Sequence, residues 1–300
     1  MREWILKKAR DLGFIAVGFS RPGTPLYFDF LKSWIASGKH GDMAWLERHL
    51  DIREDPTRLI KNCRTVISLA FPYPAAKPAT PDGYTVSRYA LPGKPDYHDR
   101  LRSLCREITQ VIRENREHAK TRICVDSAPI MERSFALSSG IGFIGKNNAL
   151  IIPGHGSFIY LAEILTTAAI DFPEAEPMES QCGSCTRCIE ACPAGALTKS
   201  FDLDARKCLS YLTIEYKGVV SVELGKKMGR CFFGCDRCQE VCPFNGDTGS
   251  TKISLPGLEA FLAMEEDVFE KKFGKTALSR PGLNKLKENI RALWSSERTY

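Results

Sequence analysis

The chain of 300 residues lacks any apolar run near the roughly 18 residues that a membrane-spanning helix needs. Its first residues, MREWILKKARDLGF, contain neither a long apolar core nor a twin-arginine pair. They alternate charged with apolar residues at helical spacing, which predicts a helix rather than an export signal. We therefore expect a cytoplasmic protein that makes no contact with a membrane. We also expect it to be a monomer.

The net charge of the chain is also small. Lys and Arg outnumber Asp and Glu by 42 to 36, and the whole difference arises in residues 271–300, which hold eight basic and two acidic residues. A basic terminal segment can contact the phosphates of a nucleic acid. A solvated helix face explains the same charges equally well, so charge alone leaves both interpretations open.

The first 172 residues alternate amphipathic helical stretches with short apolar runs, which is the pattern of an α/β domain. The pattern predicts helices at 2–12, 28–37 and 97–117 and a further helix from residue 130. It predicts strands at 14–19, 65–71, 121–125, 148–153 and 158–167. Residues 71–98 form a loop rich in Pro, Gly and Tyr, and a loop of that length is often functional.

The remainder of the chain divides into two further segments. The stretch DFPEAEPMES, with acidic residues, Pro and no periodicity, marks a boundary, and a cysteine-rich segment at 173–250 follows it. Residues 251–300 are expected to form packing helices with a basic tail. One apolar stripe at helical spacing in this last segment consists of Leu283, Leu286, Ile290 and Leu293.

Eight of the twelve cysteines are expected to bind iron. Cys182, Cys185, Cys188 and Cys192, followed by proline, have the spacing C-x2-C-x2-C-x3-C-P of two-cluster ferredoxins, whose fourth cysteine binds the other 4Fe-4S cluster. The spacing recurs at Cys235, Cys238 and Cys242, again followed by proline. A zinc site needs only four ligands and gives no reason for the repeated Cys-Pro. Disulfides are typical of secreted chains, and this sequence shows no export signal, so iron binding is the better interpretation of the cysteines.

By ferredoxin logic one cluster uses Cys182, Cys185, Cys188 and Cys242, and the other uses Cys192, Cys235, Cys238 and one more thiolate. The usual position of that last ligand, three residues before Cys235, holds Phe232. Cys208 and Cys231 are the candidates, and Cys208 is preferred. The four cysteines that are then left over show no mutual metal spacing, and a role as small buried hydrophobes is the default prediction for them: Cys63, Cys105, Cys124 and Cys231.

Four segments together resemble the epoxyqueuosine reductase family: RYALPGKPDYH, VDSAPIMERSFALSSGIGFIGKNNALI, CLSYLTIEYKG and GCDRCQEVCPFN. The likeness extends from Asp51 to about Asn245. It implies a cobalamin-binding α/β domain followed by a ferredoxin-like domain with two 4Fe-4S clusters. It also implies an oxidoreductase that converts epoxyqueuosine to queuosine in tRNA. Two electrons from an external low-potential donor would pass through the clusters to the cobalamin, and the epoxide oxygen would leave as water.

The resemblance implies that Asp126 gives a proton to the departing oxygen. Beside an apolar corrin, desolvation would favour the protonated carboxyl. Without the resemblance, an N-cap before a proline-containing first turn is the better explanation of Asp126. The cobalamin contacts carried over from the family are Arg53, Tyr89, His98, Asp126, Gly145, Lys146, Asn147, Asn148, Ser210, Cys235 and Asp236.

His98 is equally well explained as a polar residue at the start of a helix, and we do not expect it to be an axial ligand of cobalt. For tRNA, the resemblance and the charges together suggest phosphate contacts that position the substrate without reading its base. These contacts are expected from Lys217, Lys226, Lys227, Arg230 and the basic C-terminal helix.

The chain departs from the family pattern in two ways. Phe143 stands where Trp is expected, and this short form lacks the C-terminal helical-repeat domain of many members. One rival interpretation is a corrinoid-dependent reductive dehalogenase, which the DSAP segment and the missing export signal disfavour. Another is an electron carrier or activator of a corrinoid protein without catalysis of its own, which predicts neither tRNA affinity nor dependence on Asp126.

Overall fold

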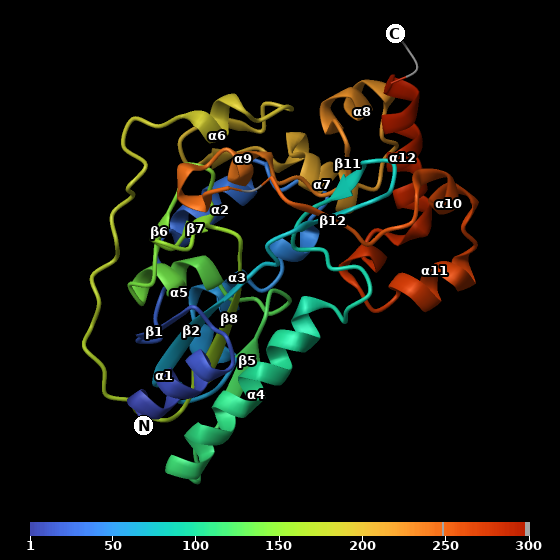
Figure 1. The fold of residues 1–300 in the computed structure, drawn as a ribbon. Coiled ribbons are helices and arrows are strands. Elements are labelled where there is room, and N and C mark those ends of the chain that lie inside the picture. Colours follow the sequence, from blue (N-terminus) through green and yellow to red (C-terminus); the bar gives the residue numbers. More distant parts are fainter. Residues whose placement is uncertain (248, 298–300) are drawn as a thin grey trace. The chain divides into compact units, whose positions relative to one another are not determined.

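The computed structural model describes residues 1–247 and 249–297, and its mixed helices and strands confirm the expected α/β class (Figure 1). The chain forms two compact units. Unit 1 comprises residues 1–38, 44–72 and 98–185, and unit 2 comprises residues 39–43, 73–97 and those from 186 onward. Unit 2 thus contains residues from each of the three segments predicted from the sequence, 1–172, 173–250 and 251–300. The division of the chain into those three domains stays a prediction. Within the described ranges, no helix is long and apolar enough to cross a membrane.

Unit 1 is built on one antiparallel sheet with the strand order β1-β2-β8-β5. These strands are β1 (Ala16–Ser20), β2 (Thr65–Pro72), β8 (Ile159–Thr166) and β5 (Thr121–Cys124). A small hairpin pairs β6 (Phe143–Ile144) with β7 (Leu150–Ile151). The helices are α1 (Arg2–Asp11), α2 (Phe28–Ala36), α3 (Leu50–Glu54), α4 (Tyr97–Asn115) and α5 (Glu132–Ser138). All the predicted elements of this part of the chain are present.

The predicted boundaries in this part of the chain lie within two residues of the observed ones, and two of the differences have a local cause. Helix α5 begins at Glu132 instead of residue 130, because the amide of Ile130 already donates to the Ala128 carbonyl in a tight turn around Pro129. The strand expected at 148–153 is reduced to Leu150–Ile151. Asn148 adopts a left-handed conformation with φ of 62°, which turns the chain at the tip of the β6–β7 hairpin.

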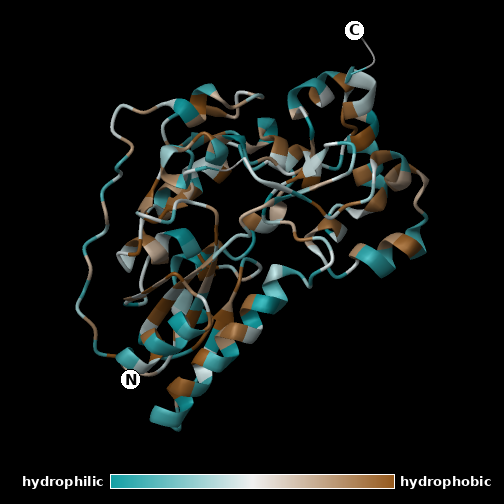
Figure 2. Cartoon of the chain, in the orientation of Figure 1, coloured by the Kyte–Doolittle hydropathy of each residue, from teal (hydrophilic) through white to brown (hydrophobic). Residues whose placement is uncertain are grey.

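The sheet of unit 1 is covered on both faces. Every residue of β2 from Thr65 to Phe71 is buried, as expected for a strand between two packed layers. Helix α5 packs on one face, where Phe135 meets Val66 and Leu165. At Gly18, a Cβ would come within 2.4 Å of the Ser139 Oγ at the end of α5, so the helix can approach β1 only over a glycine. Figure 2 shows the alternation of polar and apolar residues along α4.

Unit 2 contains a sheet with the order β11-β4-β3-β12 and a separate pair of β9 and β10. The strands are β3 (Lys77–Ala79), β4 (Thr85–Val86), β9 (Leu197–Lys199), β10 (Asp202–Leu203), β11 (Cys231–Phe233) and β12 (Thr251–Ile253). The helices are α6 (Arg187–Glu190), α7 (Leu209–Ile214), α8 (Val222–Met228), α9 (Arg237–Glu240), α10 (Leu258–Ala263), α11 (Glu266–Phe273) and α12 (Gly282–Glu297). The long loop at 71–98 therefore supplies two strands to this sheet.

The core of unit 2 gathers around α12. The predicted apolar stripe of Leu283, Leu286, Ile290 and Leu293 is confirmed, since none of the four is more than 2% exposed. Asn289 is also buried, and its amide nitrogen donates to the carbonyls of Thr213 at 2.9 Å and Phe232 at 3.0 Å. This amide ties α12 to α7 and β11, the elements that flank two of the candidate cluster cysteines.

Part of the basic C-terminal charge is used inside unit 2. The Lys285 ammonium donates to the Gly218 carbonyl at 2.6 Å and lies over the Tyr216 ring, and the Lys287 ammonium donates to the Met264 carbonyl at 2.6 Å. These two lysines are tethered to the protein's own backbone and ring. The expectation of a basic C-terminal helix that faces phosphate has less support than the sequence suggested.

Candidate active site and cluster ligands

Asp126 lies in the short loop between β5 and α5. The backbone there is left-handed, with φ of 52°, and the side chain is 47% exposed. One carboxyl oxygen, Oδ2, lies 3.1 Å from Nε2 of His98 in the first turn of α4. The N-cap of α5 is Met131, so the interpretation of Asp126 as a helix cap is wrong. His98 does stand at a helix start, and its ring also contacts the Asp126 carboxyl.

Glu132, the first residue of α5, is a site residue that the sequence did not reveal. Its Oε1 accepts a hydrogen bond from the backbone N–H of Asp126 at 2.5 Å. Burial raises the pKa of Glu132 to about 8, and the charge of Asp126 adds to that rise. The Asp126 amide, Arg133 and His98 oppose it. An acid in a first helical turn is common, so no sequence signal separates this glutamate from an ordinary one.

Basic side chains adjoin this pair of acids. Arg53 on α3 is 8% exposed, and among the described residues its Nε has no hydrogen-bond partner. Burial lowers the pKa of Arg53, and the charge of Glu132 partly offsets that effect. Arg133 donates through Nη1 to the Asn148 carbonyl. Four of the residues predicted from the resemblance thus interact with Glu132 or with Arg133 next to it: Arg53, His98, Asp126 and Asn148.

The Gly145–Asn148 segment forms the β6–β7 turn. The Gly145 amide donates to the Ala149 carbonyl at 2.9 Å, and the Asn148 amide donates back to the Gly145 carbonyl at 2.8 Å. The Lys146 ammonium donates to the carbonyls of Gly183 at 2.6 Å and Cys185 at 2.9 Å. The turn is therefore bonded to the first cysteine loop, a role that sequence spacing could not predict for Lys146.

The residues of unit 1 fit a corrin. Cobalamin carries amide and phosphate oxygens that accept hydrogen bonds, and the buried Arg53 has an Nε donor that no described residue occupies. The half-exposed Asp126 carboxyl belongs to the same group of side chains. The remaining contacts carried over from the family, Tyr89, Ser210, Cys235 and Asp236, belong to unit 2.

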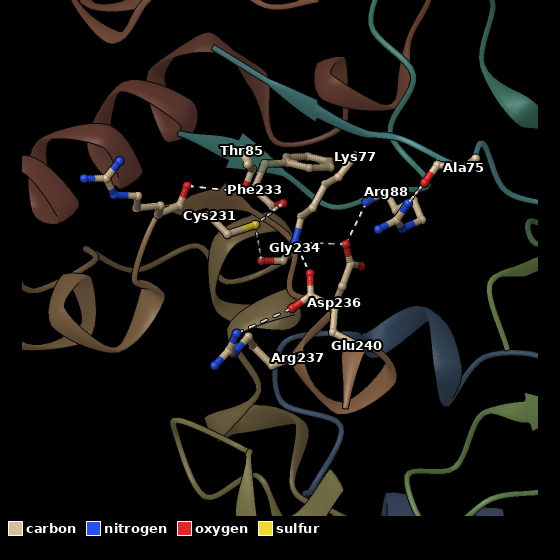
Figure 3. A network of polar contacts seen from close by, with 11 residues as sticks. Ala75, Lys77, Thr85, Arg88, Cys231, Phe233, Gly234, Asp236, Arg237 and Glu240 are labelled. Carbon is tan, nitrogen blue, oxygen red and sulfur yellow. Dashed lines mark hydrogen bonds and ion pairs between the residues drawn. The ribbon is translucent and has the colours of Figure 1, made fainter. Parts of the chain in front are cut away.

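Asp236 is held in a network within unit 2 (Figure 3). Its side chain is 3% exposed and accepts from the Arg88 amide at 2.8 Å, and the Lys77 ammonium lies 3.3 Å away. The same ammonium contacts Glu240 at 2.7 Å. Tyr89 packs against the rings of Tyr97 and Phe233. Asp236 thus has internal partners, and its contact with a corrin stays a prediction.

The two cysteine motifs share one backbone design. Each forms a four-residue helix, α6 or α9, whose last residue is separated by one residue from a cysteine-proline pair. In α6 the amides of Ile189 and Glu190 donate to the Thr186 carbonyl, and in α9 those of Gln239 and Glu240 donate to the Asp236 carbonyl. This equivalence is typical of the duplicated halves of a two-cluster ferredoxin.

Several thiols of unit 2 lie near enough to affect one another electrostatically. The pKa of Cys238 is raised, first by burial and then by the negative charges of Cys208, Cys235, Cys188 and Cys192. Five of the nine cysteines between residues 182 and 242 are therefore close enough to interact. The Cys192 Sγ also accepts the Ala196 amide at 3.2 Å, and such bonds to sulfur stabilise iron–sulfur clusters.

The two candidates for the fourth ligand differ in their surroundings. Cys208 is the N-cap of α7. The pKa of its thiol is raised, first by burial and also by the negative charge of Cys192. The Cys231 thiol donates to the carbonyls of Phe233 at 3.4 Å and Gly234 at 3.6 Å. Its pKa is raised to about 11, chiefly by burial, and Lys77 opposes that rise. Over the part of the chain that is described, no three His, Cys, Asp or Glu side chains lie close enough to hold a single metal ion.

The four predicted tRNA contacts belong to unit 2 and are exposed. Lys226 and Lys227 lie in the last turn of α8, Arg230 follows that helix, and Lys217 precedes it. The Arg230 guanidinium lies 5.6 Å from the centre of the Tyr84 ring. Contact of these four side chains with tRNA phosphates stays a prediction.

Comparison with known proteins adds independent findings. Residues 181–245 match a 4Fe-4S double cluster binding domain, and residues 53–127 match the family described as epoxyqueuosine reductase QueG. An epoxyqueuosine reductase of Leadbetterella byssophila is 38% identical over 302 residues, which cover 94% of each chain.

Solved structures extend the comparison. A crystal structure of epoxyqueuosine reductase with an epoxyqueuosine-modified tRNA-Tyr stem loop aligns with a TM-score of 0.84 at 29% identity, over 98% of this chain and 81% of that one. The Bacillus subtilis enzyme, with its catalytic aspartate loop swung out of the active site, aligns with a TM-score of 0.82 at 28% identity over the same shares.

Proposed function

Because the chain belongs to the epoxyqueuosine reductase family, we propose that it reduces epoxyqueuosine to queuosine in tRNA. The observation that carries the proposal is the Asp126 carboxyl, half exposed and 3.1 Å from His98, in a chain whose residues 181–245 match a double-cluster domain. The solved relative with a modified tRNA stem loop supports tRNA as the substrate. A tRNA substrate also agrees with the predicted cytoplasmic location, while the electron donor and the monomeric state stay predictions.

The chemistry requires electrons and protons in equal number. Two electrons and two protons convert an epoxide to an alkene and water: both carbon–oxygen bonds break, a carbon–carbon double bond forms, and the oxygen takes both protons. Asp126 is proposed to deliver a proton to this oxygen as a general acid, with His98 orienting the carboxyl. The carboxyl can return to its acid form by taking a proton from solvent, since nearly half of it is exposed.

The cofactors supply the reducing power. Cobalamin, when bound, would supply a low-potential cobalt centre for the reduction. In unit 1, Arg53, His98, Asp126 and the Gly145–Asn148 turn are proposed to hold it. Cys182, Cys185, Cys188 and Cys242 are proposed to bind one 4Fe-4S cluster, and Cys192, Cys208, Cys235 and Cys238 the other.

The test is anaerobic turnover of epoxyqueuosine-containing tRNA by reconstituted protein under a strong reductant, with and without added cobalamin. Nucleosides are then identified by mass spectrometry. We expect queuosine only when cobalamin is present. Absence of product from protein with intact clusters and bound corrin would instead favour another corrinoid substrate or an electron carrier.

The charges near α8 give a prediction for tRNA binding. In Lys226→Glu/Lys227→Glu, we expect the Kd for tRNA to rise about 10-fold or more at 0.1 M salt and the salt dependence to weaken by about two units of slope. Turnover at saturating tRNA should stay unchanged. The matched control is Lys271→Glu/Lys272→Glu, which alters an equivalent exposed pair in the last turn of α11. Equal weakening in both variants would indicate a general charge effect rather than a binding site.

A further inference from the structure

The Asp126 loop has a conformation that needs support. Asp126 has φ of 52°, in the left-handed region that disfavours residues with a side chain, although aspartate enters it more readily than most. The next amide, of Ser127, closes a very tight turn on the Val125 carbonyl at 2.5 Å. Residues 125–130 contain neither a helix nor a strand, so the loop depends on contacts with its surroundings.

Those contacts come from two helices. On one side the Asp126 amide donates to Glu132 Oε1 at 2.5 Å. On the other, Arg102 of α4 donates to the Ser127 hydroxyl at 2.7 Å, and His98 contacts the Asp126 carboxyl. The Glu132 contact is made to the backbone N–H of the left-handed residue itself. It therefore determines the conformation of Asp126 more directly than the others do.

Glu132 is fixed to a rigid element. Helix α5 packs its Phe135 into the core against Val66 and Leu165, and its Ser134 hydroxyl donates to the Leu26 carbonyl at 2.7 Å. An acceptor on such a helix can hold a flexible loop in one geometry, as a supporting shell must. A simple first-turn acid would favour the helix dipole but would need no contact with Asp126.

We propose that Glu132 is the positioning residue of the catalytic loop: its carboxyl holds the Asp126 backbone left-handed, so that the Asp126 side chain is presented beside His98. The inference rests on the proposed function, since it assumes that Asp126 is the acid. It assigns Glu132 no proton transfer to substrate. Loss of the acceptor would let the loop leave this conformation while the acid itself remained.

Several charged groups act on Glu132, and they decide how its replacement should be read. The negative charges of Asp126 and of buried Glu163 on β8 favour the neutral form of Glu132. The positive charges of Arg133, His98 and Arg53 favour its charged form. Cys124 on β5 also senses that charge. Because burial raises the pKa of Glu132 to about 8, its neutral form is favoured relative to that of an ordinary glutamate, and glutamine is a close replacement for that form.

The experiment compares Glu132→Gln with Glu132→Met, which keeps the side-chain length but removes the acceptor. At pH 7 we expect the Gln variant to retain at least about a third of wild-type kcat, and the Met variant to lose about 10- to 100-fold in kcat with an unchanged KM for tRNA. Hydrogen exchange in the peptide containing residues 125–131 should accelerate by a similar factor in the Met variant only. Between pH 7 and 9, wild type should gain on the Gln variant, because only the carboxylate can form a charge-assisted bond.

Controls separate this role from folding and from the proposed function. Glu266→Met replaces the first residue of α11, an exposed glutamate at the same helical position as Glu132. It should change neither kcat nor the hydrogen exchange of residues 125–131. If Glu132→Met loses cluster absorbance, Glu132→Ala replaces it. The proposal would be overturned if a folded variant without the acceptor kept both the wild-type kcat and the wild-type rate of hydrogen exchange. It would also be overturned if the Gln variant were as inactive as the Met variant. Hydrogen exchange tests the loop even if no tRNA turnover is found.

Discussion

Asp126→Asn is expected to reduce turnover of epoxyqueuosine-containing tRNA by at least about 100-fold, because general acid catalysis typically contributes 100- to 10,000-fold. Asparagine has the same shape and also tolerates the left-handed conformation that residue 126 adopts. Its amide can still bond to His98. What it lacks is a proton that an epoxide oxygen can take, so the loss should appear in kcat.

The same variant should keep its iron content, its corrin spectrum and its affinity for tRNA, since the change is isosteric. Asp29→Asn is the matched control, an aspartate of unit 1 in the first turn of α2 whose side chain is 95% exposed. It should retain full turnover. A fully active Asp126→Asn enzyme would exclude Asp126 as the acid and would direct attention to His98.

Local sequence pattern was sufficient for most of unit 1. Alternation and apolar runs predicted β2 and β8, since these strands lie in the interior of the sheet and are apolar along almost their whole length. The helical stripe of α12 was equally clear. The cysteine spacing revealed the duplicated motif, because ferredoxin ligation depends on short distances along the chain.

Contacts between distant segments were not predictable in the same way. Strands β3 and β4 are two or three residues long and lie in a Pro-rich loop, and their pairing with β12 and β11 joins positions more than 140 residues apart. No local preference encodes such pairing. The tethering of Lys285 and Lys287 to backbone carbonyls likewise depends on where α12 packs.

The candidate site divides along the same line. Asp126 and His98 were proposed through resemblance, and the structure adds that they contact each other across 28 residues of sequence. Glu132 was missed because its function is to accept a bond from a backbone N–H, which leaves no trace in residue type. Glu163 was hidden within an apolar strand, where its two carboxyl oxygens are buried without a partner among the described residues.

Cys208→Ser is expected to bind about half of the iron of the wild-type protein, about four of eight ions per chain, after anaerobic reconstitution. Serine is a poor ligand for these clusters, so the cluster that uses Cys192, Cys235 and Cys238 should be lost. The other cluster, with Cys182, Cys185, Cys188 and Cys242, should remain. Iron and sulfide analysis with electron paramagnetic resonance of the reduced protein would count the clusters that are left.

Cys231→Ser is the matched variant, because it makes the same change at the rival position in the same unit. The Cys231 thiol donates to two backbone carbonyls, and a serine hydroxyl can donate in its place. We expect full iron content from it. The reverse result, with iron lost only from Cys231→Ser, would transfer the fourth ligand to Cys231 and would require its thiol to turn away from Phe233 and Gly234. Since electrons are proposed to pass through both clusters, whichever variant loses iron should also lose turnover with tRNA while Asp126 is intact, which separates an electron-supply defect from loss of the acid.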